Sequence, residues 1–465
     1  MGRLNRNPLP WGMVPAIFTL AWPTMLEQLM QTAVQYVDTA MVGTLGTQAT
    51  AAVGATTTVN WLVSSTISAV GVGFLAYIAQ ACGAGRQEDA KRAAGQSVMM
   101  VLLLGTVFTA LTLGLSGFVP IWMQVDPAIQ HTASQYFFIV YAPMLFRTAT
   151  IIFGTVLRAV GDTKTPMQIG FWVNLINVVL NVFLIFPAGQ ITVWGRHIPT
   201  YGLGMGVIGA ALASAIAFTA GGLIITIKLL RHPIVSPIGT SLVPDKEVLR
   251  PCMQVALPNC LQRFATSFGY VVFASMINSL GDISTAAHSI ANTVESAFYI
   301  PGYGMQTAAA TLAGNAWGAQ DKQRIRDLTR MILAIEVGLM VISGGLLFAF
   351  APQMMGLFSK EQQVILLGAT VLRMVAVSEP FYGVSIIIEG MMQGMGNTKL
   401  PLFFNIAGMW GIRIVGTFIC TQLLGMGLIS AWACMIAHNL MLFAAFTFMT
   451  STGRHMPKVR SRSYC

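Results

Sequence analysis

The chain contains an ungapped internal repeat that covers most of its length. Residues from about 21 to 166 recur from about 256 to 401 at a constant offset of 235 positions. A clear pair is Gly161-Asp162-Thr163-Lys164-Thr165-Pro166 and Gly396-Asn397-Thr398-Lys399-Leu400-Pro401. Long, apolar repeats of this kind are typical of membrane transporters that are built from two lobes around a central site.

The composition requires a lipid environment. Only 9% of the residues are charged, 55% are hydrophobic and the mean hydropathy is +0.69, so a water-soluble surface cannot be assembled from this chain. Six stretches in each half are apolar and long enough to cross about 30 Å of hydrocarbon. They lie at about 13–43, 51–80, 93–119, 134–157, 167–187, 204–228, 249–279, 286–314, 328–350, 363–392, 402–422 and 427–449. We predict an all-α integral membrane protein with twelve transmembrane helices in two parallel six-helix lobes.

The repeat and the breaks in the apolar pattern divide the chain into four predicted parts. They are an N-lobe at 1–230, a cytoplasmic inter-lobe linker at 231–248, a C-lobe at 249–450 and a basic cytoplasmic tail at 451–465. Prolines and charged residues interrupt the apolar pattern in the linker. Leu203-Gly204-Met205-Gly206 returns as Leu424-Gly425-Met426-Gly427 at an offset of only 221, so the first lobe contains an insertion of about 14 residues.

The net charge of +10 is distributed unevenly. The basic residues between spans fall on alternate connections, whereas the opposite connections hold only Arg196 and Lys360. Because cytoplasmic loops are enriched in Lys and Arg, we predict a multi-pass protein of a bacterial inner (plasma) membrane with both termini cytoplasmic. No basic patch with interleaved aromatic residues remains, so we expect no nucleic-acid partner.

Motifs of the common enzyme classes are missing. Residues 204–209 match the GxGxxG pattern of nucleotide-binding loops, but they open a predicted membrane helix and no strand is expected before them. The chain has no Walker A loop, no HExxH and no GxSxG motif, and its six cysteines show no metal-ligand spacing. We therefore expect no enzymatic activity, no bound nucleotide or other cofactor and no metal site.

Asp38 is the leading candidate for a functional residue. A carboxylate within an apolar span is costly and by default marks an ion or proton pathway. Two polar stripes at helical spacing accompany it: Gln31 and Gln35 on its own span, and Asn174, Asn177 and Asn181 on the fifth span. Their counterparts in the second copy are Phe273 for Asp38, and Met409, Ile412 and Gly416 for the asparagines, so we expect an asymmetric polar cavity in the N-lobe. The alternative is that Asp38 only cross-links helices.

The C-lobe has polar candidates of its own. The eighth span carries Asn292, Glu295 and Tyr299 on one stripe, and the tenth carries Tyr382 and Glu389. Arg413 on the eleventh span can neutralise one of the acids, so a paired structural network and a transport site are both open. We assign no role to six charged residues that we place nearer the helix ends: Glu27, Arg147, Arg263, Glu336, Arg373 and Glu379.

Several distinct sequence motifs follow one another along nearly the whole chain. They are Pro23 followed by Val37-Asp38-Thr39-Ala40-Met41-Val42-Gly43-x-Leu45-Gly46, the Gly-Ala-Gly turn at 83–85, Leu157-Arg158-Ala159-Val160-Gly161-Asp162-Thr163-Lys164-Thr165-Pro166, Ala286-Ala287-His288-Ser289-Ile290-Ala291 and Trp410-Gly411-Ile412-Arg413-Ile414. Together these motifs resemble the multidrug and toxic compound extrusion (MATE) family. The resemblance implies a two-lobed exporter of twelve helices, in which Asp38 matches the coupling acid of the first helix. Pro23 bends that helix and is expected to act as its hinge.

The chain departs from the pattern of the MATE family in both lobes. Branches that couple through the second lobe carry a glutamate in the seventh helix and an aspartate in the tenth. In this chain no acid follows Pro258 in the seventh span. In the tenth span, Tyr382 stands at the position of the family's aspartate. An archaeal-like branch has an aspartate on the fifth helix where this chain has Asn181. Asp38 is therefore the acid that we expect to carry coupling.

We hypothesise that the protein is a secondary active multidrug efflux antiporter. The resemblance implies that amphipathic, often cationic drugs or toxic metabolites leave in exchange for H⁺ or Na⁺ as the two lobes rock around a central cleft. The expected partners are small-molecule drugs or organic cations, the coupling ion and the lipid bilayer. Two alternatives are a flippase of lipid-linked oligosaccharides, which calls for a strongly cationic cleft, and an intramembrane enzyme.

Overall fold

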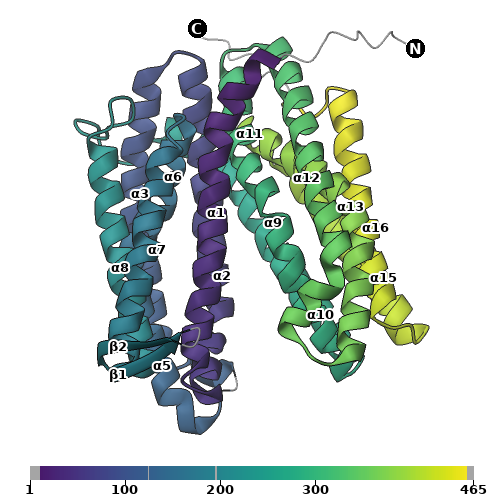
Figure 1. Ribbon diagram of the computed structural model, residues 1–465. Coiled ribbons are helices and arrows are strands. Elements are labelled where there is room, and N and C mark those ends of the chain that lie inside the picture. Colours follow the sequence, from purple (N-terminus) through teal and green to yellow (C-terminus); the bar gives the residue numbers. More distant parts are fainter. Residues whose placement is uncertain (1–10, 124, 194–195, 458–465) are drawn as a thin grey trace. The chain divides into compact units, whose positions relative to one another are not determined.

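The computed structural model describes residues 11–123, 125–193 and 196–457. These residues are almost entirely helical (Figure 1), which confirms the predicted all-α class. The helices of the first half are η1 (Trp11–Met13), α1 (Val14–Gly43), α2 (Thr47–Gly83), α3 (Gln87–Leu115), α4 (Val119–Trp122), α5 (Pro127–Tyr141), α6 (Met144–Ala159), α7 (Lys164–Ile185) and α8 (Gly206–Leu230). Those of the second half are α9 (Lys246–Asn278), α10 (Asp282–Phe298), α11 (Ile300–Gly318), α12 (Lys322–Phe358), α13 (Gln362–Gly394), α14 (Lys399–Ile406), η2 (Ala407–Ile414), α15 (Val415–Phe418), η3 (Ile419–Leu423) and α16 (Leu428–Ser451).

Most of the predicted spans are apolar helices long enough to cross a membrane. Over the described residues eight spans meet that criterion, and a ninth is added if α5 and α6, which meet at a bend of 47°, count as one. The predicted spans 13–43, 249–279 and 286–314 are helical but do not meet it. The first two carry charged and amide side chains, and the third is divided at Tyr299 into α10 and α11. Polar residues in a bilayer must face protein or water, so the polar faces of these helices are expected to be turned away from lipid.

The described chain separates into two compact units. The N-terminal unit consists of residues 26–74 and 87–250, and the C-terminal unit of residues 11–25, 75–86 and 251–457. The division after residue 250 lies close to the end of the predicted linker, whereas the start of α1 and the end of α2 group with the second half. The predicted limits of the N-lobe and the C-lobe stay a prediction.

In the N-terminal unit, α8 packs against α5, α6 and α7, and α6 also packs against α3 (Figure 1). Glycines allow the helices to approach closely. A Cβ atom on Gly222 of α8 would lie 2.5 Å from Phe146 Cβ on α6, and one on Gly209 would overlap the Leu184 carbonyl group on α7. Lipid supplies no hydrophobic driving force between helices, so their association depends on such close van der Waals packing.

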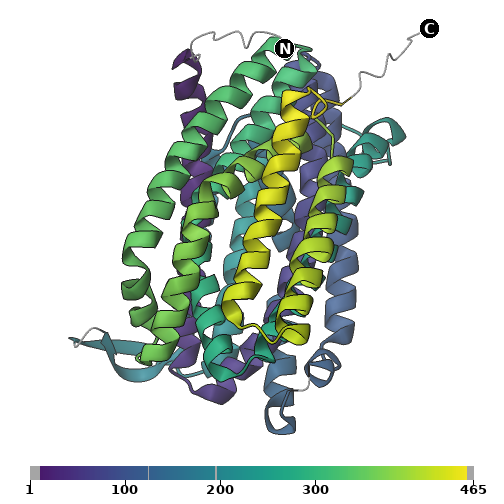
Figure 2. The ribbon, with the colours of Figure 1, turned by 90° about the vertical axis from the view of Figure 1, so that its right-hand side faces the viewer.

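In the C-terminal unit, α13 packs against α11, α12 and α16 (Figure 2, with α16 in yellow). A Cβ atom on Gly394 of α13 would overlap the Ala310 carbonyl oxygen of α11. Trp432 of α16 is fully buried, and its indole N–H donates to His288 Nδ1 of α10 at 3.2 Å. The stretch from α14 to η3 contains two π-helical segments at the place where the first half has the regular helix α7.

The two copies of the repeat share backbone conformation at their turns. The φ angle is +88° at Gly161 and +85° at its counterpart Gly396. It is +73° at Gly85 and +57° at Gln320, the counterpart of Gly85 and the only described non-glycine residue with a positive φ. Residues with a side chain rarely adopt this region. The second copy therefore keeps the turn at a position where it lacks the glycine.

A β-hairpin accounts for the insertion in the first half. β1 (Pro187–Val193) and β2 (Arg196–Leu203) pair antiparallel and connect α7 to α8. The matching connection in the second half, residues 424–427, has no strand. The expectation that no strand precedes Gly204 is wrong, because β2 ends at Leu203. The strand belongs to an antiparallel hairpin, however, whereas a dinucleotide-binding glycine loop follows a strand of a parallel βαβ unit.

The predicted linker at 231–248 is attached to α3 within the N-terminal unit. Gln96 Nε2 donates to the carbonyl oxygens of Ser241 at 3.1 Å and Val243 at 2.9 Å, and Gln96 Oε1 accepts from the Asp245 N–H at 3.0 Å. Arg92 also forms an ion pair with Asp245. Burial acts to raise the pKa of the Asp245 carboxyl, but hydrogen bonds from backbone N–H groups and from Arg92 outweigh it and hold that pKa below its usual range. These contacts fix the linker in one conformation.

We expect Gly222→Leu to destabilise the N-terminal unit, because the added side chain must displace Phe146 and separate α6 from α8. Overpacking of this kind costs about 1–3 kcal/mol. Thermal unfolding of the detergent-solubilised protein measures the effect. Gly114→Leu on α3 is the matched control, because nothing lies within 4 Å of a Cβ atom at that position. Equal unfolding midpoints for the two variants would contradict the packing described for α6 and α8.

Candidate functional site

Three helices of the N-terminal unit assemble the predicted polar cavity. Asn181 Nδ2 of α7 donates to Asp38 Oδ1 of α1 at 2.6 Å. In the amide orientation that satisfies its neighbours, Asn177 Nδ2 of α7 donates to Asp38 Oδ1 at 2.8 Å and to Oδ2 at 3.2 Å. The Asn177 oxygen then accepts from the Ser214 hydroxyl of α8 at 3.1 Å. The structure thus brings Asp38, Asn177 and Asn181 together.

Neutral amides, rather than a cation, surround Asp38. Among the salt bridges within the described ranges, none involves Asp38. Asn181 Oδ1 and Asn174 Nδ2 are buried, and neither has a hydrogen-bond partner in the part of the chain that is described. A carboxylate and an amide oxygen are the ligand types that hard cations prefer, and a carboxylate without a counter-ion can instead take up a proton. The site can therefore change its charge by binding either ion.

The other predicted residues of α1 lie apart from this network. The side chains of Gln31 and Gln35 are exposed, and over the described residues neither donates to Asp38. Pro23 is buried in the part of α1 that belongs to the C-terminal unit. The adjacent Thr24 hydroxyl lies 2.8 Å from the Ala21 carbonyl oxygen and 2.8 Å from that of Gly304 on α11. A proline removes a backbone hydrogen bond of its helix, and the hinge role of Pro23 stays a prediction.

In the C-terminal unit, three amides hold Glu389 of α13. Its Oε1 accepts from Gln262 Nε2 of α9 at 2.8 Å and from Gln393 Nε2 at 3.0 Å. Its Oε2 accepts from Asn405 Nδ2 of α14 at 3.2 Å. A half-buried carboxylate whose two oxygens are both paired rigidifies the elements that supply its donors, here α9, α13 and α14. This arrangement favours the structural alternative for Glu389.

Two predicted tyrosines, Tyr299 between α10 and α11 and Tyr382 of α13, meet a third tyrosine. The Tyr382 hydroxyl lies 3.0 Å from the Tyr303 hydroxyl of α11, and the ring of Tyr299 packs edge-on against both rings. Asn292, on the same predicted stripe as Tyr299, is exposed. The aromatic cluster therefore joins α10, α11 and α13 without Asn292.

Arg413 lies over aromatic rings in the C-terminal unit. Its guanidinium carbon is 5.1 Å from the ring centroid of Tyr270 and 5.3 Å from that of Phe273. Its Nε and Nη1 atoms are buried and have no hydrogen-bond partner among the described residues. Glu295 is also buried, and no ion pair between it and Arg413 is found in the described ranges. The expected neutralisation of an acid by Arg413 therefore stays a prediction.

Two buried acids of the C-terminal unit were not among the candidate site residues that we predicted from the sequence. Glu336 and Glu379 lie near the middle of α12 and α13, not nearer the helix ends as we expected. They are 0% and 1% exposed, and none of their carboxyl oxygens has a hydrogen-bond partner among the described residues. Gly383 makes room for one of them, because a Cβ atom there would lie 3.0 Å from Glu336 Oε1. The signal available was the presence of carboxylates within apolar spans.

A buried ion pair also escaped the prediction. Arg158 Nη2, at the end of α6, donates to Glu27 Oε1 at 2.6 Å and to Oε2 at 2.7 Å. Glu27 lies in α1, and both side chains belong to the N-terminal unit. Arg158 stands in the motif Leu157-Arg158-Ala159-Val160-Gly161, one of those that carry the family resemblance, which was the one hint in the sequence that it has a defined place.

A model of the family described as MatE matches residues 23–183 and 258–419. The two matched ranges coincide with the two copies of the internal repeat. The chain is 28% identical over 446 residues to a probable multidrug resistance protein NorM of Thermotoga maritima, with 93% of this chain and 92% of the relative covered. It is 26% identical over 419 residues to the probable multidrug resistance protein YoeA of Bacillus subtilis, with 88% and 87% covered.

Solved structures share the fold. A multidrug resistance MATE family transporter of the MOP superfamily, in an outward-facing conformation, matches with a TM-score of 0.86 at 22% identity over 95% of this chain and 96% of that chain. A MOP superfamily transporter from Pyrococcus furiosus matches with a TM-score of 0.85 at 23% identity over 94% and 95%. These matches support the arrangement of helices over nearly the whole chain.

We expect Arg158→Leu to destabilise the protein by about 3–5 kcal/mol, because it leaves the Glu27 carboxylate buried without its partner. Replacing both partners of a buried pair by apolar residues is often neutral, so the double variant Glu27→Leu/Arg158→Leu should recover most of the loss. Thermal unfolding in detergent measures both. A double variant that is less stable than Arg158→Leu would show that the pair is not the reason for the loss.

Proposed function

The chain belongs to the MatE family of transporters, and we propose that it is a secondary active multidrug efflux antiporter. It exports amphipathic, often cationic drugs or toxic metabolites in exchange for H⁺ or Na⁺. The observation that carries the proposal is Asp38, a carboxylate within a long helix whose partners are the neutral amides of Asn177 and Asn181. The printed names of the Thermotoga and Bacillus relatives support multidrug substrates.

Ion binding at Asp38 supplies the driving force for the conformational change. The carboxylate is negative when empty and neutral when it holds H⁺ or Na⁺, and a bilayer penalises the charged form. A ligand shifts a conformational equilibrium by the difference in its affinity for the two states. The two states of the site therefore favour different conformations, and we propose that movement of the two lobes against each other alternates access for drug and ion.

Both coupling ions fit the site. Asn181 Oδ1, which has no hydrogen-bond partner among the described residues, favours Na⁺, because a second oxygen ligand is available. Asp38 alone suffices for H⁺. Transport in proteoliposomes with either a sodium gradient or a pH gradient imposed separately distinguishes the two.

We expect Asp38→Asn to abolish ion-coupled export while the protein stays folded. The amide keeps the shape of the carboxylate but can neither take up a proton nor add a full charge to a sodium site. Efflux of a cationic dye such as ethidium from proteoliposomes, driven by each gradient in turn, should fall to the level of protein-free vesicles. Glu88→Gln, the same chemical change at an exposed position of α3, is the control.

Asn181→Ala should weaken coupling without abolishing it. It removes one hydrogen bond to a charged group, which is worth about 1.5 kcal/mol or more, so the apparent affinity for the coupling ion should fall about tenfold. The ion concentration at half-maximal efflux measures the change. If Asp38→Asn exports dye against a gradient at the rate of the unmodified protein, the coupling role of Asp38 is wrong, and the buried acids of α10, α12 and α13 become the candidates.

We further propose that the protein resides in a bacterial inner membrane with both termini in the cytoplasm. The proposal rests on the alternation of basic connections in the sequence. A reporter fused after Cys465 should be active in the cytoplasm, and one inserted near Gly195 should be active outside; both positions lie outside the described residues. The reverse pattern would contradict the proposed orientation.

A further inference from the structure

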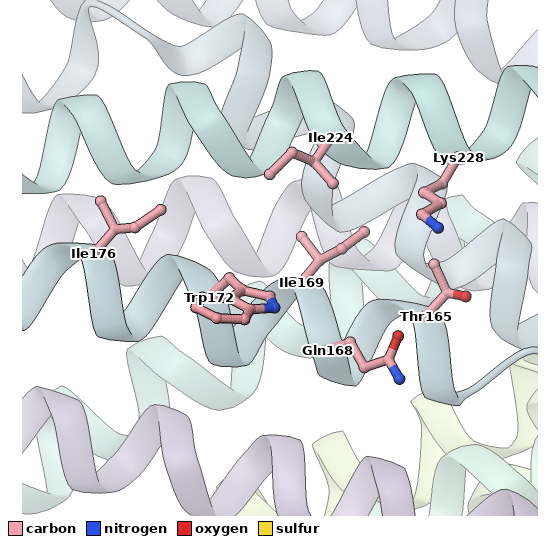
Figure 3. Close-up of a pocket in the computed structure, with 7 residues that line it drawn as sticks. All are labelled: Thr165, Gln168, Ile169, Trp172, Ile176, Ile224 and Lys228. Carbon is pink, nitrogen blue, oxygen red and sulfur yellow. The ribbon is translucent and has the colours of Figure 1, made fainter.

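A groove with a volume of about 460 Å³ lies between α7 and α8 of the N-terminal unit. Its two ends differ in chemistry (Figure 3). Lys228 of α8 and Thr165 and Gln168 of α7 place an ammonium, a hydroxyl and an amide group at one end. The remainder is lined by apolar side chains: Ile169, Trp172, Ile176 and Ile224. The groove is therefore amphipathic along its length.

The groove opens to the surroundings of the helices. Trp172 is 55% exposed and Ile224 is 37% exposed, although both are apolar. Lys228 is exposed as well, and no ion pair or hydrogen bond of its ammonium is found among the described residues. Acyl chains are as apolar as these side chains, so an exposed apolar wall on a membrane protein suits an occupant that comes from the bilayer.

The length of the groove matches one leaflet. Thr165 and Ile176 are eleven residues apart on α7, which is about 16 Å along an α-helix. Half of a hydrocarbon core of about 30 Å is about 15 Å. A lipid whose headgroup lies beside Thr165 can thus extend one acyl chain along the groove as far as Ile176.

The charge at the polar end favours an anionic headgroup. Lys164, directly before Thr165, and Arg231, three residues after Lys228, are exposed at the same ends of α7 and α8. One acid, Asp162, lies nearby, and its Oδ1 accepts from the Thr165 N–H at 3.0 Å. Three cations against one acid leave a positive excess on the predicted cytoplasmic side, where basic pockets between helices bind anionic headgroups.

We propose that this groove binds an anionic phospholipid. Its phosphate is held by the Lys228 ammonium with the Thr165 hydroxyl and the Gln168 amide, and one acyl chain lies along Ile169, Trp172, Ile176 and Ile224. The lipid holds α7 against α8, and α7 carries Asn177 and Asn181, which bind Asp38. Bound lipid therefore stabilises the helix that supplies the amides of the candidate ion site. The proposal does not depend on which substrate the protein transports.

The test compares lipids and variants on the purified, detergent-solubilised full chain. Phosphatidylglycerol and phosphatidylcholine with identical acyl chains are added separately, and binding is followed by native mass spectrometry and by the thermal unfolding midpoint. We expect phosphatidylglycerol to bind more tightly and to raise the midpoint further. A single basic residue near an anionic surface contributes about fivefold in affinity, so Lys228→Gln should weaken phosphatidylglycerol binding about fivefold. Lys246→Gln, at an exposed lysine of the same unit, should leave it unchanged.

Two further variants complete the test. Lys228→Arg separates the effect of charge from an effect on folding, and Ile224→Trp separates contacts to the acyl chain from contacts to the headgroup. Lys228→Arg should retain phosphatidylglycerol binding, because the positive charge remains. Ile224→Trp should reduce binding by filling the apolar part of the groove while Lys228 is kept. Inorganic phosphate alone should not raise the midpoint. Equal affinity for the two lipids, equal losses in Lys228→Gln and Lys246→Gln, or a phosphate effect as large as that of the lipid would each overturn the proposal.

Discussion

The structure depends on the cost of leaving a polar group unpaired in hydrocarbon. Water is not available there to satisfy a carboxylate, so the protein must supply its partners or bring an ion to it. Three solutions appear in this chain. Glu27 is paired with the cation of Arg158, Glu389 is saturated by three amides, and Asp38 is contacted by two amides and by no cation in the described ranges. Of these three, only the third leaves a charge that a mobile ion can neutralise, which makes Asp38 a candidate for exchange. Glu336 and Glu379, which have no hydrogen-bond partner among the described residues, form a fourth case.

The two copies of the repeat have kept their framework and have changed their polar chemistry. The first copy places Asp38 against asparagines of α7, whereas the second has Phe273 at the matching position, under the guanidinium of Arg413. The regular helix α7 corresponds to a stretch with two π-helical segments in the second half. Segments of π-helix often occur at functional positions, and here one of them contains Arg413. The second copy thus presents a cation and aromatic faces where the first presents a carboxylate and amides.

The periodic features of the chain were predictable from its sequence, and the long-range pairs were not. The constant offset of the repeat predicted the two ranges that the family model matches, and the change of offset located the insertion that is a β-hairpin. The membership of the MATE family, expected from the motifs, is confirmed by that match. Helical spacing also put Asn177 and Asn181 on one face, where both contact Asp38.

The spacing of polar residues within one helix did not predict which of their side chains are covered by neighbouring helices. Gln31 and Gln35 share a stripe with Asp38, yet their side chains are exposed. Glu336 and Glu379 were misplaced, although the predicted spans 328–350 and 363–392 put both residues well inside a helix, where the rule for carboxylates in apolar spans applies. The pair of Glu27 and Arg158 joins residues that are 131 positions apart, and no local pattern encodes such a contact.

The left-handed turn at Gln320 indicates how a duplicated chain diverges. A backbone conformation that disfavours side chains costs of order 1–3 kcal/mol when a residue other than glycine adopts it. The second copy bears that cost although Gly85 shows that a strain-free solution exists at the matching place. At this turn the two copies share the path of the main chain, whereas the amino acid differs. Relatives of this protein can therefore be expected to keep the positions of such turns longer than they keep the residues that made them easy to form.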